Sequence, residues 1–220
     1  MKKYLETLKN NEFFLGLTKE TILSLVSSEA CYLKNYCAGS TIYECGQPIL
    51  HAGIVLEGEI DILHTTEDGY ENIVTRFLPS HTFGASFCCA SDLNTINTFR
   101  SVTTSTVLFL NIPLLLHTLQ NRGTYYSAFA ENVIRTLAAN NIRLNAKIHV
   151  LTKKTLREKL LTYFEILSAQ THSSEITLPF NREQLASYLG SERSSVCREL
   201  SRLAEEHIIE INRNRIILLG

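Results

Sequence analysis

The sequence predicts an α+β protein in which a strand-rich half is followed by a helical half. From Cys31 to Leu110, short apolar segments such as GIVLEGEIDIL are separated by glycines, and the last segment, FRSVTTSTVLFL, is rich in β-branched residues. Regular short strands of this kind indicate a β-sandwich or roll. After Pro113 the pattern changes, because residues 124–149 contain no glycine or proline. A parallel α/β fold, in which strands and helices alternate, does not fit this order.

The helical half is expected to contain a long helix at about residues 124–149. Its positions step mostly by four and three residues, close to a heptad seam, as in a helix that pairs with a copy of itself. A helix that packs on its own domain is the alternative. Asn140 would set the register of a paired seam. The predicted seam consists of Tyr126, Ala130, Val133, Leu137, Asn140, Leu144 and Ile148.

The C-terminal region predicts a helix-turn-helix followed by a hairpin. The segment NREQLASYL begins with Asn181, which suits the N-cap of a helix, and Gln184 follows three residues later, close to a capping-box pattern. Gly190 then separates this helix from a second one, and IIEINRNRIILL reads as two strands around residues 212–214. Helix, short turn, helix and hairpin is the order of a winged helix-turn-helix.

The second of these helices carries arginines among small hydroxyl residues, in the segment LGSERSSVCREL. In a helix-turn-helix this helix lies in the major groove of DNA, where Arg pairs with guanine and Ser bonds base edges or phosphates. An ordinary surface helix, with Arg198 and Arg202 paired to nearby glutamates, is the alternative. The residues expected to contact DNA are Asn181, Arg182, Ser191, Arg193, Ser194, Ser195, Cys197 and Arg198, with Asn181 and Arg182 on phosphate.

Composition is that of an ordinary soluble protein. The chain has 220 residues, of which 45% are hydrophobic and 20% charged, and its formal net charge is -1. No apolar run approaches the roughly 20 residues that span a bilayer, and the charged N-terminus lacks the apolar stretch of a signal peptide. We therefore expect a cytoplasmic protein without a membrane partner. The small net charge does not exclude DNA, because a local patch of arginines can supply the phosphate contacts.

Over nearly its whole length the chain resembles the CRP/FNR family of bacterial transcription regulators. FNREQLASYLGSERSSVCRELSRLAEEHII is similar to the family's helix-turn-helix, with the Arg-x-x-Val-x-Arg core at Arg193, Val196 and Arg198. AGSTIYECGQPILHAGIVLEGEIDIL and FLPSHTFGASF are similar to its glycine-spaced roll and to the start of its effector-binding cassette.

The resemblance implies an N-terminal double-stranded β-helix, a cupin-like jelly roll of the cyclic-nucleotide-binding type. It further implies a homodimer paired through the long helices, whose DNA-binding heads reorient when a ligand enters the roll. Residues 1–150 would form the sensing domain with the pairing helix, and residues 151–220 the DNA-binding domain. The implied partners are a palindromic operator in double-stranded DNA and, for an activator, RNA polymerase. No enzymatic activity is expected.

Departures from the family pattern concern the ligand. Members that bind cyclic AMP carry Phe-Gly-Glu at the start of the cassette, but here Ala85 follows Phe83 and Gly84. Their later Arg-Ser pair, which grips the phosphate, is replaced by Thr95 and Ile96. A buried phosphate without a cation would be costly, so we expect another small effector. The candidate pocket residues are Phe83, Gly84, Ala85, Ser86, Cys88, Cys89, Arg100, Asn140 and Asn141.

The recognition helix and the cysteines also depart from family patterns. Relatives often carry Glu after the first Arg of the helix, where this chain has Ser194, so a different half-site is expected. The six cysteines show no Cys-x-x-Cys spacing, which favours reduced, structural thiols and no metal or other cofactor. A thiol, redox or metal sensor of the same fold, using Cys88 and Cys89 or the N-terminal Cys31, Cys37 and Cys45, is the alternative. Haem ligation by the isolated His51, His64 or His81 is a weaker one.

Overall fold

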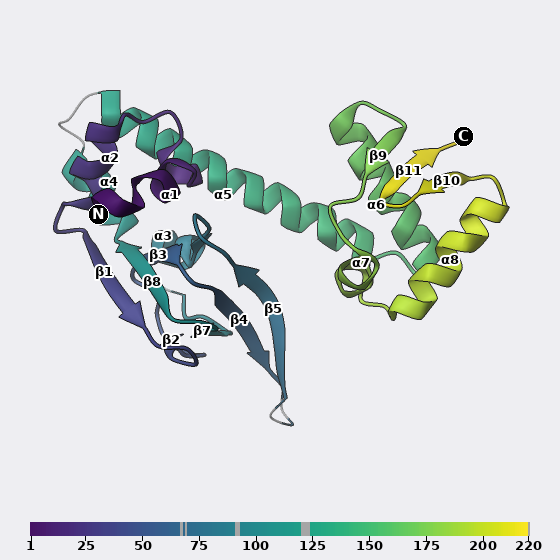
Figure 1. Ribbon diagram of the computed structural model, residues 1–220, viewed down its shortest axis with the longest axis horizontal. Coiled ribbons are helices and arrows are strands. Elements are labelled where there is room, and N and C mark those ends of the chain that lie inside the picture. The colour runs from purple at the N-terminus through teal and green to yellow at the C-terminus, as the bar shows by residue number, and fades with distance from the viewer. Residues whose placement is uncertain (67, 69, 91–92, 120–123, 220) are drawn as a thin grey trace. The chain divides into compact units, whose positions relative to one another are not determined.

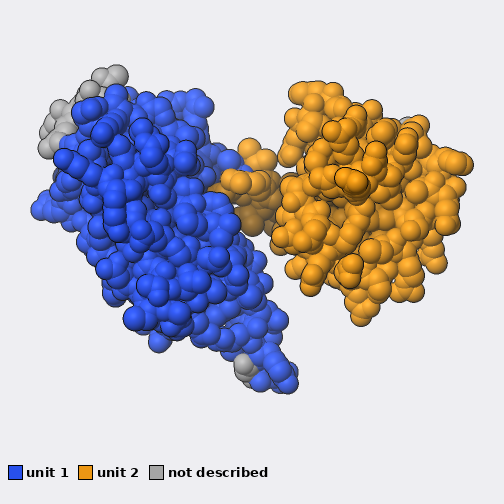
Figure 2. Space-filling model, in the orientation of Figure 1, with its two compact units in different colours: residues 1–139 blue, residues 140–220 orange. Residues whose placement is uncertain are grey.

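The computed structural model describes residues 1–66, 68, 70–90, 93–119 and 124–219; for residues 119 and 124–126 it describes the backbone alone. The chain forms two compact units, residues 1–139 and residues 140–220 (Figure 2). Among the described residues no helix is long and apolar enough to cross a membrane.

The first unit contains a β-roll made of two four-stranded antiparallel sheets (Figure 1). One sheet has the strand order β1-β8-β3-β6, and the other has the order β2-β7-β4-β5. The strands are β1 (Cys31–Tyr36), β2 (Thr41–Tyr43), β3 (Ala52–Glu57), β4 (Ile60–Thr65), β5 (Glu71–Phe77), β6 (Thr82–Phe83), β7 (Thr98–Ser101) and β8 (Ser105–Leu110). The prediction of a strand-rich segment from Cys31 to Leu110 is confirmed at both ends.

Helices pack against the roll and share one apolar core with it. They are η1 (Lys2–Tyr4), α1 (Leu5–Lys9), η2 (Glu12–Phe14), α2 (Lys19–Val26), α3 (Ala85–Ala90), α4 (Ile112–Leu119) and the first part of α5 (Thr124–Leu151). Phe13 and Phe14 of η2 contact Phe129 of α5, with ring centroids 6.3 and 6.0 Å apart. Asn11 is fully buried and its amide donates to Ser80 O and Thr82 Oγ1, both at 2.7 Å, so the N-terminal segment is bonded to the turn that leads into β6.

The second unit is a helix-turn-helix with a three-stranded sheet of order β10-β11-β9. It contains the end of α5, α6 (Leu156–Thr171), β9 (Glu175–Thr177), α7 (Arg182–Leu189), α8 (Arg193–Glu205), β10 (Ile209–Asn212) and β11 (Arg215–Leu218). Val150 of α5 is buried in its core, and Lys147 lies over the ring of Tyr188 of α7 at 5.3 Å. These contacts explain why the second unit begins within α5, before the boundary after residue 150 that the domain prediction uses. The predicted α+β architecture with a long helix and a winged helix-turn-helix is confirmed.

Two faces of α5 differ in burial, and the predicted seam is divided between them. Val133 is buried in the core of its own unit and Leu137 packs against that core, so Val133 leaves no surface for a partner. Leu144 and Ile148 are exposed, and Ala130 and Asn140 are half-buried. The side chain of Tyr126 lies outside the described residues. A second heptad spacing lies one residue beyond the predicted seam from 134 to 145 and shares Ile148 with it. Its members are all exposed and are Ile134, Ala138, Asn141, Asn145 and Ile148.

Candidate nucleic-acid interface

The turn between α7 and α8 forms as the sequence predicts. Asn181 Oδ1 accepts from the backbone N–H of Gln184 at 2.9 Å, and Gln184 Oε1 accepts from the N–H of Asn181 at 3.0 Å, which completes the capping box. At the other end of α7, Gly190 adopts φ 61, a left-handed conformation that glycine adopts without steric cost. These two local features fix where α7 begins and where the chain turns into α8.

Burial divides α8 into two faces. Val196, Leu200 and Leu203 are buried in one core with Leu185 and Leu189 of α7, as expected from their spacing. Arg193, Ser194 and Arg198 are exposed. Because the apolar face holds α8 against α7, the side chains of this exposed face are presented to solvent in a fixed order.

The arginines of α8 differ in their partners. Arg202 pairs with Glu199 at 3.5 Å, as the surface-helix alternative expects. Arg198 instead bonds its own helix, from Nε to Ser194 O and from Nη2 to Ser195 Oγ, both at a long 3.4 Å. Within the described part of the chain no carboxylate lies within ion-pair distance of Arg198 or Arg193. Two guanidinium groups at the start of the helix are therefore available to an anion.

The start of α8 also lacks a side-chain cap. Glu192 occupies the N-cap position but makes no capping bond, and its carboxylate accepts only a 3.5 Å contact from Ser194 Oγ. The first N–H groups of a helix are unpaired in the helix itself and attract phosphate. Of the other residues expected at the interface, Ser191, Ser195 and Cys197 are half-buried beside this terminus.

Arg182, expected on phosphate, makes a contact that the sequence did not indicate. Its Nη2 donates to the carbonyl of Arg213, in the turn between β10 and β11, at 3.0 Å. Arg213 is exposed and was not assigned a role by the sequence analysis, although the Asn-Arg-Asn turn of the predicted hairpin was a signal for it. The hairpin of β10 and β11, the wing of this domain, is thus bonded through Arg213 to the first residue of α7.

The segment predicted to be the effector cassette lies in the first unit, and Phe83 occupies the interior of the roll. Its ring is 5.5 Å from that of Phe99, 5.8 Å from Phe77 and 6.3 Å from Phe109. A Cβ on Gly53 would come within 2.2 Å of this ring, so the glycine makes room for the phenylalanine. The centre of the roll is packed with aromatic side chains.

The remaining cassette residues are mostly apolar or exposed. Ala85 and Cys88 are buried in the core that also holds Phe129 and Val133. Gly84 has φ 72, Ser86 is exposed and Cys89 is half-buried. No charged side chain belongs to helix α3.

Thr95 and Ile96, the residues expected in place of the family's Arg-Ser pair, differ in burial. Thr95 is 1% exposed; its Oγ1 donates to Asn97 O at 3.0 Å and accepts from Asn97 N at 3.1 Å. Ile96 is 70% exposed. The hydroxyl of Thr95 therefore closes a local turn, and neither side chain supplies a cation.

Arg100 alternates with Phe99 on β7 and so projects from the opposite face of that strand. Its guanidinium forms a two-point ion pair with Glu71, with Nη2 at 2.7 Å from Oε1, and this pair lowers the pKa of Glu71. The other two candidates, Asn140 and Asn141, belong to the second unit, where they accept hydrogen bonds from Arg143 at 2.8 Å and from Asn145 at 2.7 Å.

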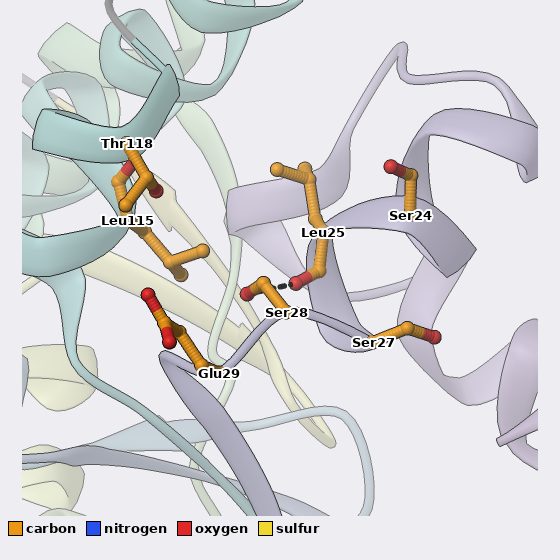
Figure 3. A pocket seen from close by; sticks show the side chains of 7 residues that line it. All are labelled: Ser24, Leu25, Ser27, Ser28, Glu29, Leu115 and Thr118. Carbon is orange, nitrogen blue, oxygen red and sulfur yellow. Dashed lines mark hydrogen bonds between the residues drawn. The ribbon is translucent and has the colours of Figure 1, made fainter.

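A pocket of about 370 Å³ lies elsewhere, between the end of α2 and α4 (Figure 3). Ser28 Oγ donates to Leu25 O at 2.7 Å, and Thr118 Oγ1 donates to Leu115 O at 3.1 Å. These two hydroxyls are thus bonded within their own helical segments. The lining residues are Ser24, Leu25, Ser27, Ser28, Glu29, Leu115 and Thr118.

Comparison with known proteins agrees with this geometry in both units. Residues 33–122 match the cyclic nucleotide-binding domain, and residues 142–220 match the Crp-like helix-turn-helix domain. The cAMP-activated global transcriptional regulator CRP of Pasteurella multocida is 18% identical over 190 residues, which cover 86% of this chain and 91% of that protein. The chain belongs to the CRP/FNR family.

Solved structures of CRP/FNR proteins show the same fold. The catabolite activator protein of Thermus thermophilus has a TM-score of 0.56 at 19% identity, covering 94% of this chain and 93% of its own. The c-di-GMP responsive regulator CLP of Xanthomonas campestris has a TM-score of 0.55 at 15% identity, covering 92% and 100%. As a member of this family, the chain is a DNA-binding transcription regulator with a domain of the cyclic-nucleotide-binding type.

Three thiols of the first unit, those of Cys31, Cys88 and Cys89, are shielded rather than activated. Burial raises the pKa of Cys31 to about 11, and burial together with the neighbouring Cys88 raises the pKa of Cys89 to about 11. Burial also raises the pKa of Cys88, whose thiol donates to Leu50 O at 3.2 Å. Since the thiolate is the reactive form, the raised pKa values lower the reactivity that is expected of these three thiols at neutral pH. Among the described residues no three His, Cys, Asp or Glu side chains gather as a metal site would require.

This order of shielding predicts the order of thiol labelling. In a short iodoacetamide pulse at pH 8, the exposed Cys37 and Cys45 should react first, and Cys31, Cys88 and Cys89 about tenfold or more slowly, because so little thiolate is present. Peptide mass spectrometry gives the extent at each site, and protein unfolded in urea is the control, in which all sites should react alike. Rapid labelling of Cys88 or Cys89 in the folded protein would instead support the thiol-sensor alternative.

Proposed function

We propose that this regulator is a homodimer that reads a palindromic operator and responds to a small effector other than cyclic AMP. Residues 1–150 would sense the effector and pair the subunits, and residues 151–220 would bind DNA and, in an activator, act beside RNA polymerase. The observation that carries the proposal is the difference between Arg198 and Arg202. On one helix, the arginine nearer the N-terminus has no carboxylate partner in the described structure, whereas the next one is neutralised by Glu199.

Recognition of the operator's base sequence is assigned to the exposed start of α8. Arg193 and Arg198 would pair with guanine, Ser194 and Ser195 would bond base edges or phosphate, and Cys197 would make van der Waals contact beside them. Ser191 and Asn181 would lie at the backbone, where the uncapped N–H groups of α8 bind phosphate.

Subunit pairing is assigned to the exposed side of α5. Since Val133 and Leu137 pack into their own unit, the pairing surface would use the displaced spacing that ends at Ile148. Asn145 Nδ2 donates to Asn141 Oδ1 at 2.7 Å, and such a polar pair in a seam would set the register.

The proposal that the effector is not cyclic AMP follows from the charges of the cassette residues. Relatives respond to cAMP in one case and to c-di-GMP in another, so this fold serves more than one ligand. In this chain, Ala85 and Thr95 replace the Glu and Arg that hold a cyclic nucleotide, and Arg100 is already paired with Glu71. A ligand with less negative charge than a phosphate ester suits this cassette better.

The proposal for DNA reading is tested by Arg198→Ala and its matched control Arg202→Ala. With an operator selected from a random duplex pool, R198A should lose about ten- to hundredfold in discrimination against single-base variants, the worth of one bidentate base contact. R202A, which removes a side chain of the same type from the same helix, should change discrimination by no more than about twofold. Fluorescence anisotropy titrations at fixed salt measure both, and equal effects of the two substitutions would contradict the assigned roles.

Cyclic AMP should not bind. Calorimetric titration of the full chain with cyclic AMP is expected to give no saturable heat, and operator affinity should be the same with and without the nucleotide. The physical reason is that, among the described residues of the cassette, Thr95 carries no charge and Arg100 is already paired with Glu71. A saturable isotherm together with tighter DNA binding would overturn this part of the proposal.

Pairing through α5 is tested by Ile148→Glu. Ile148 is 58% exposed, and a charge at this position in a paired seam should shift the dimer towards monomer at micromolar concentration in sedimentation velocity. Leu50→Glu is the matched control, since Leu50 is 56% exposed on the roll and receives the same change. If the I148E protein remains as dimeric as L50E, the pairing surface lies elsewhere.

A further inference from the structure

The turn of the wing has an unusual residue at its tip. Asn212 pairs with Arg215 across the hairpin, which leaves Arg213 and Asn214 as the two residues of the turn. Arg213 has φ 55, in the left-handed region that glycine and asparagine adopt most readily. Asparagine stands on both sides of it, yet the strained position itself carries a long cationic side chain. An observed backbone outlier of this kind points to a use for the side chain.

Both carbonyls of this turn are bonded by other elements. The N–H of Leu178, just after β9, donates to Asn214 O at 2.8 Å, and Arg182 Nη2 donates to Arg213 O at 3.0 Å. The second bond comes from the first residue of α7, the helix that crosses the DNA backbone in a helix-turn-helix. The wing tip is therefore held at a fixed place beside the start of α7.

The side chain of Arg213 is available, in contrast to its neighbour on β11. Arg215 pairs with Glu175 at 2.9 Å, whereas in the described structure no acidic side chain lies within ion-pair distance of the exposed Arg213. Asn212 and Asn214, also exposed, add neutral amide donors on either side. The tip thus presents one guanidinium between two amides on a narrow turn.

We propose that Arg213, flanked by Asn212 and Asn214, enters the minor groove next to the half-site and favours A·T base pairs there, and that Arg182 is a positioning residue for this tip. The inference rests on the proposed function in DNA binding. Narrow A·T-rich minor grooves attract inserted arginines through their enhanced negative potential, and arginine and asparagine are the side chains that read the acceptors A N3 and T O2. In this assignment Arg182 acts through the wing and not chiefly as a phosphate contact.

Three versions of the selected operator test the proposal with the full-length protein. They share one core and differ only in base pairs outside it, which are A·T, G·C or I·C; inosine lacks the N2 amino group that G·C places in the minor groove. The wild type should bind the A·T and I·C versions alike and about tenfold more tightly than the G·C version. Arg213→Gly, which suits the positive φ, should bind all three within about twofold of one another and unfold at no lower temperature.

Two further variants separate positioning from charge. Arg182→Ala should reduce the tenfold preference to about threefold or less, because the tip loses one of its two anchors. Arg215→Ala is the control that removes a cation from the same hairpin away from the tip, and it should keep the full preference.

Two results would overturn the inference while the proposed function stands. One is a wild type that binds its core site with no preference among the three flanks. The other is an equal loss on all three flanks in R213G, which would make Arg213 a phosphate contact. A wild type that selects no duplex at all is a different result, because it contradicts the proposed function itself.

Discussion

Burial of the apolar face of α8 is the constraint on which the DNA-binding half depends. Val196, Leu200 and Leu203 share a core with Leu185 and Leu189, and this contact decides which side of α8 faces solvent. Burying a leucine or valine side chain is worth about 1.5–3 kcal/mol, more than a surface ion pair at about 0–1 kcal/mol. Orientation of the helix is thus set by its apolar side, and the arginines on the other side are free to serve recognition.

Ion pairs then refine this arrangement instead of creating it. Arg157 of α6 bonds Glu206 just after α8 and lies 3.6 Å from Glu199, which in turn pairs with Arg202. Glu199 of α8 and Glu206 just after the helix are therefore engaged by Arg202 and by Arg157 of α6. Because they are used there, the N-terminal half keeps its arginines unneutralised in the described structure, as phosphate binding requires.

Local signals made the helix-turn-helix predictable from the sequence. Features that depend on packing between distant segments of the chain were not predictable in this way. Asn181, Gln184 and Gly190 act within a few residues of one another, so their effect can be inferred from sequence. Which of Val133 and Ile134 on α5 is buried cannot be inferred from sequence, since both residues are apolar and adjacent. The buried face is determined by the packing of the N-terminal Phe13 and Phe14 around Phe129. The bond from Arg182 to Arg213 O likewise joins residues far apart in sequence. The positive φ of Arg213 could not be predicted either, because the position is not a glycine.

The cassette that is expected to hold an effector is stabilised by contacts within the protein. Removing one partner of a buried ionic contact leaves a group whose desolvation is not compensated. Here Ala85 adds to the apolar core, and the hydroxyl of Thr95 is hydrogen-bonded to the backbone of Asn97. Within the described residues no buried side-chain nitrogen or oxygen lacks a hydrogen-bond partner. The described residues of the roll therefore satisfy their own buried polar groups, and in the proposed function an effector would contribute binding free energy through contacts other than a phosphate–arginine pair.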